Sequence, residues 1–323
     1  MTKFFKSSLP AVAVLAIGGI VTMHAGAQGT FPAKPVELVV PYAAGGGTDA
    51  LARSFADASR KHMDQPMIIV NKPGASGGIG MNDVINAKPD GYRLAIIATD
   101  VLTVPLLGIA KLSYRDLQPI AQLNYDPAAI TVRADSPLNS LQDFVKAAKA
   151  SPGSVQVGNS GTGAIWHLAA AALEDKTAVK FNHVPFQGAS PAVLALLGGH
   201  IDAVAVSPAE VAPHVRAGKV KILAVMADQR VKGYEQVPTA KESGVDLSIG
   251  TWRALAAPKN TPPEVMTKLR AIAQQTAAEA SFKEATAKLD LGYAYLDAEA
   301  FSANLSSDNA KFKQLIEKLQ IKP

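Results

Sequence analysis

The stretch 36–49 reads VELVVPYAAGGGTD and decides the fold. Its first five residues, of which three are valine and one is leucine, form a mostly apolar run of strand length. A glycine-rich loop follows, and the segment from Asp49 to about Met63 has the composition of a helix. A strand that leads through a short loop into a helix is the opening of an α/β unit.

The same succession recurs along the chain. A strand at 67–70, a glycine-rich loop at 73–80 opening a second helix, and a strand at 94–98 complete a first series. A second series begins near Ala129 and includes the expected strands 155–158, 179–184 and 203–206. The pattern predicts the α/β class with mostly parallel strands.

Helix signals support the second series and the last third of the chain. Ser140 precedes an expected helix that runs to Ala150, and Ser207-Pro208-Ala209-Glu210 forms a capping box with proline at the first helical position. A final helix is expected over 298–319. Two arrangements remain open: two consecutive domains, or a chain that crosses over and returns so that its last third completes the first domain. The extended run 248–257 would then be the return crossing.

Composition excludes several classes of protein. The 323 residues include 25 Gly and 21 Pro but no Cys, and 48% are hydrophobic and 18% charged. Disorder and coiled coils do not fit these values, and disulfides, cysteine zinc sites and thiol nucleophiles are impossible. The net charge of +5 is spread along the chain and does not indicate nucleic-acid binding.

The first residues resemble an export signal. Lys3 and Lys6 precede an apolar run over 9–21, and Ala25-Gly26-Ala27 is a small-x-small cleavage pattern. We therefore expect cleavage after Ala27, a mature chain of net charge +3 that begins at Gln28, and a location in the periplasm.

Two glycine-rich loops are the main candidates for a binding site. Residues 42–48 (YAAGGGT) and 158–163 (GNSGTG) each lie between an expected strand and an expected helix, one in each series. Loops at the carboxyl ends of strands hold ligands in open α/β sheets, and a helix N-terminus attracts an anion. Two such loops facing each other would hold a carboxylate; each loop alone is more simply a tight turn.

Enzyme motifs are weak by comparison. Neither loop continues as a phosphate-binding Gly-Lys-Ser/Thr sequence, and 158–163 does not match the dinucleotide fingerprint. Residues 74–78 (GASGG) match the G-x-S-x-G of serine hydrolases, which keeps an exported hydrolase using Ser76 as an alternative. The histidines show no metal-ligand spacing, and His167 is the one that deserves a closer look because it follows the second loop. We predict no enzymatic activity, no metal and no cofactor.

Several longer motifs, taken together, resemble one family. They are 41–49 (PYAAGGGTD), 70–80 (VNKPGASGGIG), 89–92 (PDGY), 161–163 with His167-Leu168, 198–202 (GGHID) and 217–219 (AGK). In this order they resemble the tripartite tricarboxylate transporter substrate-binding proteins, also called the Bug family, over essentially the whole mature chain.

This resemblance implies a two-domain periplasmic-binding-protein fold of the Venus-flytrap type, with a ligand cleft between the domains. It implies residues 28–124 plus 252–323 as one domain and 125–251 as the other, and a monomer. The partners it implies are a small di-, tricarboxylate or aromatic acid and the membrane permease subunits of a tripartite transporter. A receptor that delivers its ligand to a membrane histidine kinase is a further alternative. Carried over residue by residue, the ligand contacts would be Tyr42, Ala44, Gly45, Gly46, Asp49, Ser76, Ser160, Gly161, Thr162 and Phe186.

Three positions depart from the family pattern and are expected to set selectivity. Asp100 stands where many members have a Ser/Thr-rich run, and it would repel a second carboxylate or receive an amine or hydroxyl. Trp166 occupies a position that is usually small or polar, and Ser207 begins its helix where larger polar groups are common. Trp166 slightly favours an aromatic or larger apolar acid.

Overall fold

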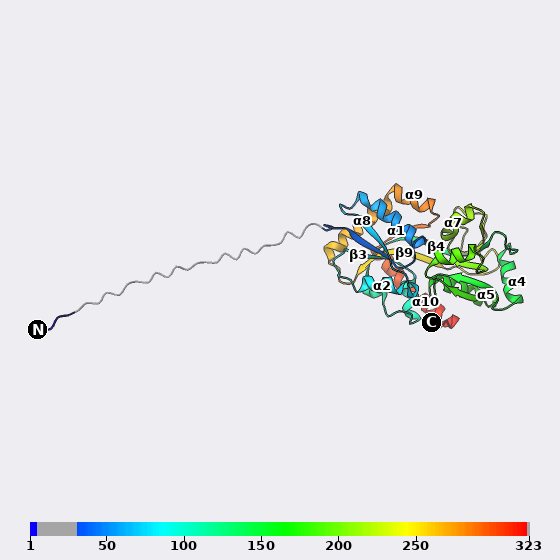
Figure 1. Ribbon diagram of the computed structural model, residues 1–323, viewed down its shortest axis with the longest axis horizontal. Helices are drawn as coiled ribbons and strands as arrows, with labels where there is room; N and C mark the ends of the chain where they lie inside the picture. Colours follow the sequence, from blue (N-terminus) through cyan, green and yellow to red (C-terminus); the bar gives the residue numbers. More distant parts are fainter. Residues whose placement is uncertain (5–30, 322–323) are drawn as a thin grey trace. The chain divides into compact units, whose positions relative to one another are not determined.

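The computed structural model describes residues 1–4 and 31–321. The chain forms two compact units, Met1–Phe31 and Pro32–Pro323, and everything below concerns the second (Figure 1). The apolar part of the predicted signal peptide and its cleavage after Ala27 lie outside the described residues. Among the helices that the structure describes, none is both long and apolar enough to cross a membrane.

The first half of the chain forms three parallel strands and their helices. Strand β1 pairs with both β2 and β3, so it lies between them. Strands β1 and β2 each lead through a loop into a helix, as the sequence predicts, and β3 leads into a further helix that was not predicted. The elements are β1 (Val36–Val40), α1 (Gly47–Ala58), β2 (Met67–Asn71), α2 (Gly78–Ile85), β3 (Arg93–Ala98) and α3 (Asp100–Leu106), with short 3-10 turns at Ser59–Lys61, Ala75–Gly77 and Tyr114–Asp116.

A second parallel group follows after the long strand β4 (Leu117–Arg133). Strand β5 pairs in parallel with β6 and β7, and the predicted strand 203–206 is confirmed as β7. The elements are α4 (Leu141–Ala150), β5 (Gln156–Asn159), α5 (Ile165–Thr177), β6 (Asn182–Pro185), α6 (Ala189–Leu197), β7 (Ala203–Val206), α7 (Pro208–Arg216) and β8 (Val220–Met226).

The last third returns to the first group of strands. Strand β9 (Gly250–Pro258) pairs antiparallel with β3 and β4, and β10 (Tyr293–Asp297) pairs antiparallel with β4. Helices α8 (Pro263–Ala278), α9 (Ala280–Lys288) and α10 (Ala298–Leu319) complete the chain. This path is the one that the crossing-and-returning arrangement requires. In Figure 1 the orange helix α9 accordingly lies beside the blue helix α1.

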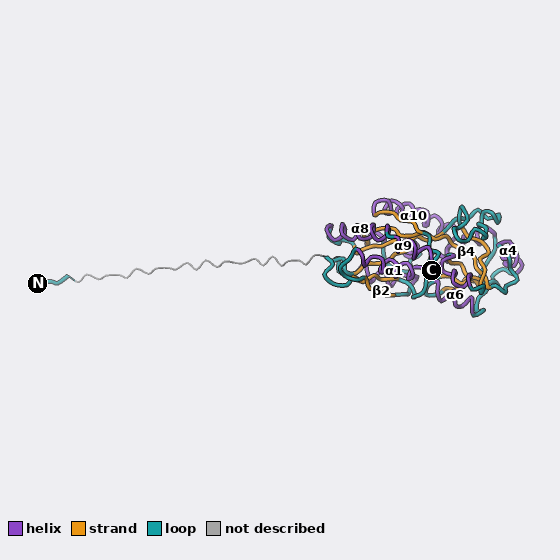
Figure 2. Tube along the Cα trace, turned by 90° about the horizontal axis from the view of Figure 1, so that it is seen from above, coloured by secondary structure: helices purple, strands orange, loops and turns teal. Residues whose placement is uncertain are grey.

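The strands form one curled sheet in the order β2-β1-β3-β9-β4-β7-β5-β6, with β8 and β10 also paired to β4. Strand β4 pairs with β9 up to Pro127 and with β7 and β8 from Ala128 onwards. We call the elements around β1–β3, β9 and β10 the first lobe and those around β5–β8 the second lobe. The tube in Figure 2 shows the strands running between helices. The division into domains at 124/125 and 251/252 stays a prediction.

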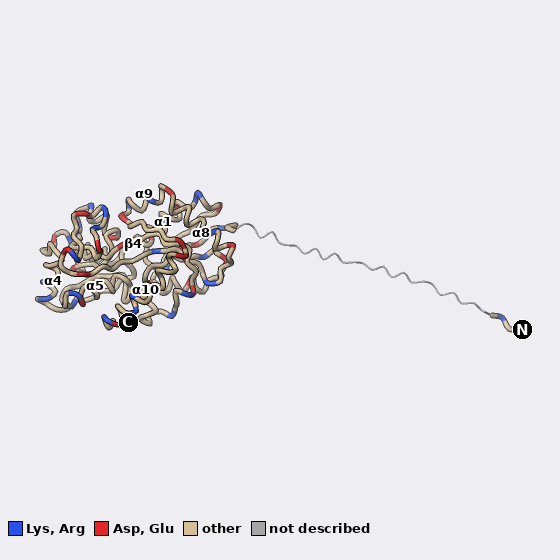
Figure 3. The backbone as a smooth tube through the Cα atoms, turned by 180° about the vertical axis from the view of Figure 1, so that it is seen from behind, with Lys and Arg blue, Asp and Glu red and all other residues tan. Residues whose placement is uncertain are grey.

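Each lobe has its own apolar core. The strands and helices of each lobe therefore carry the apolar patterns from which the sequence analysis predicted them. Phe144, Trp166 and Leu168 belong to the core of the second lobe, whereas Met81 and Phe301 belong to that of the first. Phe312 of α10 packs against both cores. Lys and Arg residues are interspersed with Asp and Glu residues along the described part of the chain (Figure 3).

Candidate functional site

The first glycine-rich loop is held by a carboxylate at the start of α1. Asp49 Oδ2 accepts from the backbone N–H of Gly45 at 3.0 Å and from Arg53 Nε at 2.9 Å, and Asn71 Nδ2 donates to Oδ1 at 2.9 Å. Burial acts to raise the pKa of Asp49, but these hydrogen bonds outweigh it and lower the pKa. Gly45 has φ +83°, a left-handed conformation that favours glycine. Asp49 therefore organises the loop from within α1.

The second loop, between β5 and α5, is held from both ends. Gly161 N–H donates to Asn159 Oδ1 at 3.0 Å, and Gly163 N–H donates to His167 Nδ1 at 3.0 Å. Burial, with the neighbouring His183, lowers the pKa of His167 from 6.5 to about 4. The imidazole that accepts the Gly163 bond is thus neutral, with its proton on Nε2. His167 supports the loop, and among the described residues no group of three potential metal-binding side chains occurs.

We expect His167 to make the protein sensitive to acid. A histidine whose folded pKa is depressed contributes stability that is present above the unfolded pKa of 6.5 and is lost as the pH falls towards about 4. His167→Gln keeps an acceptor for Gly163 but cannot titrate. The free energy of unfolding, followed by urea denaturation, should therefore fall less steeply in His167→Gln than in the wild type between these two pH values. At about pH 8 the wild-type imidazole is neutral in both the folded and the unfolded state. The difference in unfolding free energy between wild type and His167→Gln at this pH therefore measures packing alone. If the unfolding free energies of wild type and His167→Gln changed equally with pH, His167 would not be the source of the acid sensitivity.

The second glycine-rich loop lies against loop 73–80 and helix α3 of the first lobe. Ser76 Oγ donates to the carbonyl of Thr162 at 2.6 Å, and Thr103 Oγ1 donates to the carbonyl of Gly163 at 2.8 Å. On the other side of the cleft, Ala43 N–H donates to the carbonyl of Gln187 at 3.3 Å. The structure is therefore a closed arrangement in which backbone groups of the second lobe accept bonds from the first.

Asp100 links the lobes more directly. It is the first residue of α3, and its Oδ1 accepts from the backbone N–H of Ile165 at 2.6 Å, at the N-terminus of α5. Its Oδ2 accepts from the Tyr42 hydroxyl. Burial raises the pKa of Asp100 to about 6 and raises that of Tyr42 well above its ordinary value. A side-chain carboxylate of the chain itself thus occupies the helix end at which the sequence analysis places an anionic ligand.

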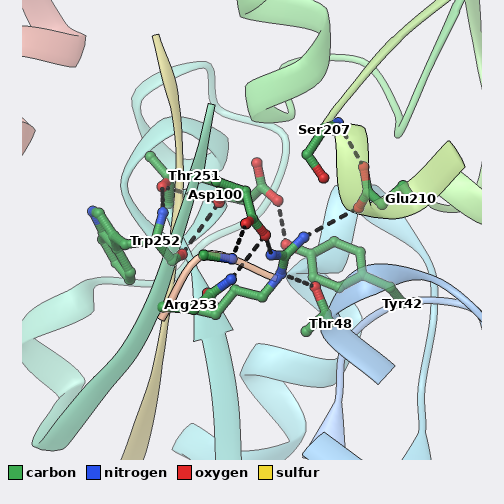
Figure 4. A network of polar contacts seen from close by, with 12 residues as sticks. Tyr42, Thr48, Asp100, Ser207, Glu210, Thr251, Trp252 and Arg253 are labelled. Atoms are coloured by element: carbon green, nitrogen blue, oxygen red, sulfur yellow. Dashed lines mark hydrogen bonds and ion pairs between the residues drawn. The ribbon is translucent and has the colours of Figure 1, made fainter. Parts of the chain in front are cut away.

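A buried arginine lies at the centre of the site. Arg253 of β9 is 1% exposed, and its guanidinium donates to Asp126 of β4, to Glu210 Oε1 of α7 at 3.1 Å and to Thr48 Oγ1 at 2.8 Å (Figure 4). Glu210 also accepts from the backbone N–H of Ser207 at 3.0 Å, which is one half of the predicted capping box. Burial raises the pKa of Glu210, although Arg253 acts in the opposite direction.

These groups surround a narrow buried cavity between the lobes. Its volume is about 20 Å³, room for one water molecule. Of the predicted ligand contacts, six line it and lie together: Tyr42, Gly46, Asp49, Asp100, Ser160 and Trp166. The remaining seven do not line it: Ala44, Gly45, Ser76, Gly161, Thr162, Phe186 and Ser207. Four of these seven still meet where loop 73–80 touches the second glycine-rich loop. A Cβ on Gly161 would lie 2.6 Å from Ser76 Oγ and 3.3 Å from the Phe186 carbonyl oxygen, beside the bond from Ser76 to Thr162.

The sequence analysis missed three of the charged groups. Arg253, Glu210 as a cavity residue and Asp126 were not among its candidates, and Thr48 and Thr251 also line the cavity. One signal was available: an arginine in an otherwise apolar strand has to be paired, because an unpaired buried charge is prohibitively costly. Which carboxylates pair with it was not readable from the strand itself.

The serine-hydrolase alternative finds no support in this geometry. Ser76 does have a left-handed backbone, with φ 51° and ψ 39°. Its hydroxyl, however, donates to a peptide carbonyl, which cannot act as the general base that a nucleophilic serine needs. Ser76 instead joins loop 73–80 of the first lobe to the second glycine-rich loop.

Comparisons with known proteins agree with this architecture. Residues 51–321 match the family model described as tripartite tricarboxylate transporter family receptor. A ligand-free crystal structure of a TctC solute-binding protein from Polaromonas is 57% identical, with 90% of this chain and 100% of that one covered and a TM-score of 0.66. The periplasmic binding protein BugD is 31% identical over 90% of this chain and 99% of its own, with a TM-score of 0.86.

A third solved structure has a ligand. MatC from Rhodopseudomonas palustris with bound malate is 27% identical over 88% of this chain and 100% of its own, with a TM-score of 0.82. The family match over most of the chain and the shared fold lead to one conclusion: this chain belongs to the tripartite tricarboxylate transporter receptor family, whose members are solute-binding receptors with the periplasmic-binding-protein fold.

Proposed function

We propose that this receptor binds an organic carboxylate in the cavity between its lobes, in the periplasm, and delivers it to the permease subunits of a tripartite transporter. The observation that carries the proposal is that both predicted loop regions border one buried cavity, with Tyr42 and Gly46 from the first and Ser160 from the second. The malate bound to the related MatC supports a carboxylate as the ligand.

The unmatched hydroxyl of Ser160 supports a ligand at this point. The residue is 4% exposed, and its buried Oγ has no hydrogen-bond partner among the described residues. Buried polar atoms without a partner are rare and require an explanation. A ligand oxygen in the cavity would accept a hydrogen bond from this hydroxyl.

Ligand capture would be a change in population between open and closed forms. The closed form already contains direct bonds between the lobes, such as those of Asp100 with Ile165 and Ser76 with Thr162. The ligand-free Polaromonas structure has a lower TM-score than BugD although it is far more similar in sequence. Two chains that are 57% identical share a fold. We therefore infer that the structure of this protein and the ligand-free Polaromonas structure differ in conformation. A ligand needs more room than the closed cavity offers, which makes opening a requirement for entry.

A thermal-shift screen tests the proposal. The purified protein is heated with mono-, di-, tri- and aromatic carboxylates, and with sugars and inorganic cations as controls. A ligand present at about 100 times its dissociation constant adds about 2.7 kcal/mol of stability, which gives a clear shift of the melting temperature. Stabilisation by a sugar or a cation and by no carboxylate would contradict the proposal.

Ser160→Ala separates a ligand contact from a structural role. Because the Ser160 hydroxyl has no partner, its removal should leave the free energy of unfolding within about 0.5 kcal/mol of the wild type or raise it. The affinity for the carboxylate identified in the screen should fall by about fivefold to tenfold, the value of one hydrogen bond. The matched control is Ser59→Ala: its buried hydroxyl donates to the Ala56 carbonyl at 2.9 Å, so we expect a loss of stability without a loss of affinity. If Ser160→Ala lost stability but kept its affinity for the carboxylate, Ser160 would not be a ligand contact.

A further inference from the structure

The charges that line the cavity do not balance. Four of the lining residues that the structure describes are charged: Asp49, Asp100, Glu210 and Arg253. Asp49 is paired with Arg53, whose side chain is 54% exposed. The other three lie inside the cavity between the lobes, where Arg253 is the only buried cation among the described residues.

The positive charge of Arg253 does not balance the negative charges of both Asp100 and Glu210. Its guanidinium is shared between Glu210 and Asp126, which lies behind it on β4. Asp126 is already satisfied, since it also accepts from Asn124 Nδ2 at 2.8 Å and from Gly292 N–H at 2.8 Å. One positive charge therefore faces three buried carboxylates. Asp100 has neutral partners only, the Tyr42 hydroxyl and the Ile165 N–H.

Asp100 also occupies the N-terminus of α5, the helix that follows the second glycine-rich loop. In the two-loop arrangement expected from sequence, the starts of α1 and α5 both attract the ligand's negative charge. The Ile165 N–H at the start of α5 instead binds a carboxylate of the chain itself. A ligand with negative charge at both ends would meet Asp100 and Glu210 rather than helix N–H groups, and like charges brought together in a buried site repel each other strongly.

We propose that the physiological ligand carries a cationic nitrogen in addition to a carboxylate, and that Asp100 and Glu210 receive that nitrogen. This rests on the function proposed above and narrows the ligand class from organic acids in general to amino acids and related zwitterions. The unpartnered Ser160 hydroxyl in the same cavity is the independent indication that a polar ligand group is bound there. An ammonium group would make up the positive charge that the three carboxylates lack, and its N–H groups would bind to oxygens of Asp100 and Glu210, the two that line the cavity.

The raised pKa values of Asp100 and Glu210 are consistent with this shortage of positive charge. Burial is the largest cause for both, and Arg253 offsets only part of it. A cation that enters next to Asp100 should lower the pKa of this carboxyl group and release a proton, whereas an anion should raise the pKa and take a proton up. At pH 6, close to the pKa of about 6, the number of protons exchanged is large enough to measure.

The test compares matched ligands that differ in one end group. β-Alanine, succinate and butyrate share a carboxylate on two methylene groups and carry an ammonium, a second carboxylate or a methyl group at the other end; 4-aminobutyrate, glutarate and pentanoate form the next longer set. Isothermal titration calorimetry of the purified protein at pH 6, in buffers of different ionisation enthalpy, gives affinity and proton exchange together. We expect the amino acid of at least one set to bind about tenfold or more tightly than its diacid and its monoacid, with proton release.

Two variants and one control assign the preference to these residues. Asp100→Asn and, independently, Glu210→Gln should reduce the preference for the amino acid over the diacid by about tenfold. The two variants protect the test against a folding defect in either one. Asp57→Asn, on the exposed face of α1 where the carboxylate is 83% exposed, should leave the preference unchanged.

The outcomes separate this inference from the proposed function. Diacids that bind as tightly as the amino acids, or more tightly and with proton uptake, overturn the inference and leave a carboxylate receptor intact. A preference that survives both Asp100→Asn and Glu210→Gln overturns the assignment to these residues. If no carboxylate in either set or in the thermal screen binds, the proposed function itself fails and the inference falls with it.

Discussion

Arg253→Met is expected to lower the free energy of unfolding by about 3–5 kcal/mol. The guanidinium is 1% exposed and is the shared partner of Asp126 and Glu210, whose side chains are 3% and 4% exposed. Methionine fills a similar volume but leaves two buried carboxylates without a cation. Removing one partner of a buried charge group is costly because the charge that remains is desolvated and unpaired.

Urea denaturation near neutral pH measures this effect, and its pH dependence identifies the cause. The defect should shrink as the pH falls, because protonation removes the uncompensated negative charge. Asp126→Asn combined with Glu210→Gln in the Arg253→Met background should recover part of the loss, since these substitutions remove the orphaned charges.

Arg230→Met provides the control. Arg230 Nε donates to both carboxylate oxygens of Glu242, at 3.0 and 2.9 Å, but both side chains are more than 40% exposed. A surface pair of this kind contributes about 0–1 kcal/mol. If Arg253→Met cost no more than Arg230→Met, the buried network would not be the stabilising unit that the geometry indicates.

Gly161→Val should weaken ligand binding by about 100-fold or more, equivalent to about 2.7 kcal/mol. Gly161 has φ +127°, and a Cβ there would lie 2.6 Å from Ser76 Oγ and 3.3 Å from the Phe186 carbonyl oxygen. Ser76 belongs to the first lobe, so the added side chain would separate the two lobes at the point where their loops touch. The closed form would be destabilised relative to the open one, and the apparent affinity falls with the population of the closed form.

Calorimetric titration with the carboxylate found in the thermal screen measures the affinity, and small-angle X-ray scattering of the ligand-free protein reports the opening. Gly153→Val is the matched control: Gly153 also has positive φ, +77°, but a Cβ there has no atom within 4 Å. We expect Gly153→Val to introduce backbone strain as Gly161→Val does, but to leave the affinity for the carboxylate unchanged. Gly161→Ala should bind more weakly than the wild type, and Ser76→Gly added to it should restore part of the affinity by removing the atoms in the way. Equal affinities of Gly161→Val and the wild type would refute the contact between the loops as a condition of closure.

The sequence by itself determined most of the local structure. Strand 36–40, strand 203–206 and helix 298–319 were predicted with the bounds that the structure shows. The cap at Ser140 was also correct, since its Oγ accepts from the Asp143 N–H at 3.0 Å. These features depend on apolar periodicity and on capping bonds between residues at most a few positions apart, and both are written directly in the sequence. The family followed from motifs with the same local character.

Only the tertiary structure decided the chemistry of the cavity. Strand β4 was not recognised as one 17-residue strand, because Pro119, Asp126 and Pro127 interrupt the apolar pattern that identifies a strand. Without β4 beside β9, nothing indicates that Arg253 meets Asp126, 127 positions away in the chain, and Glu210 of the other lobe. The meeting of Asp100 with the start of α5 likewise depends on how the lobes close. Contacts of this kind are fixed by the path of the chain and by the requirement that every buried charge find a partner, and neither can be read from neighbouring residues alone.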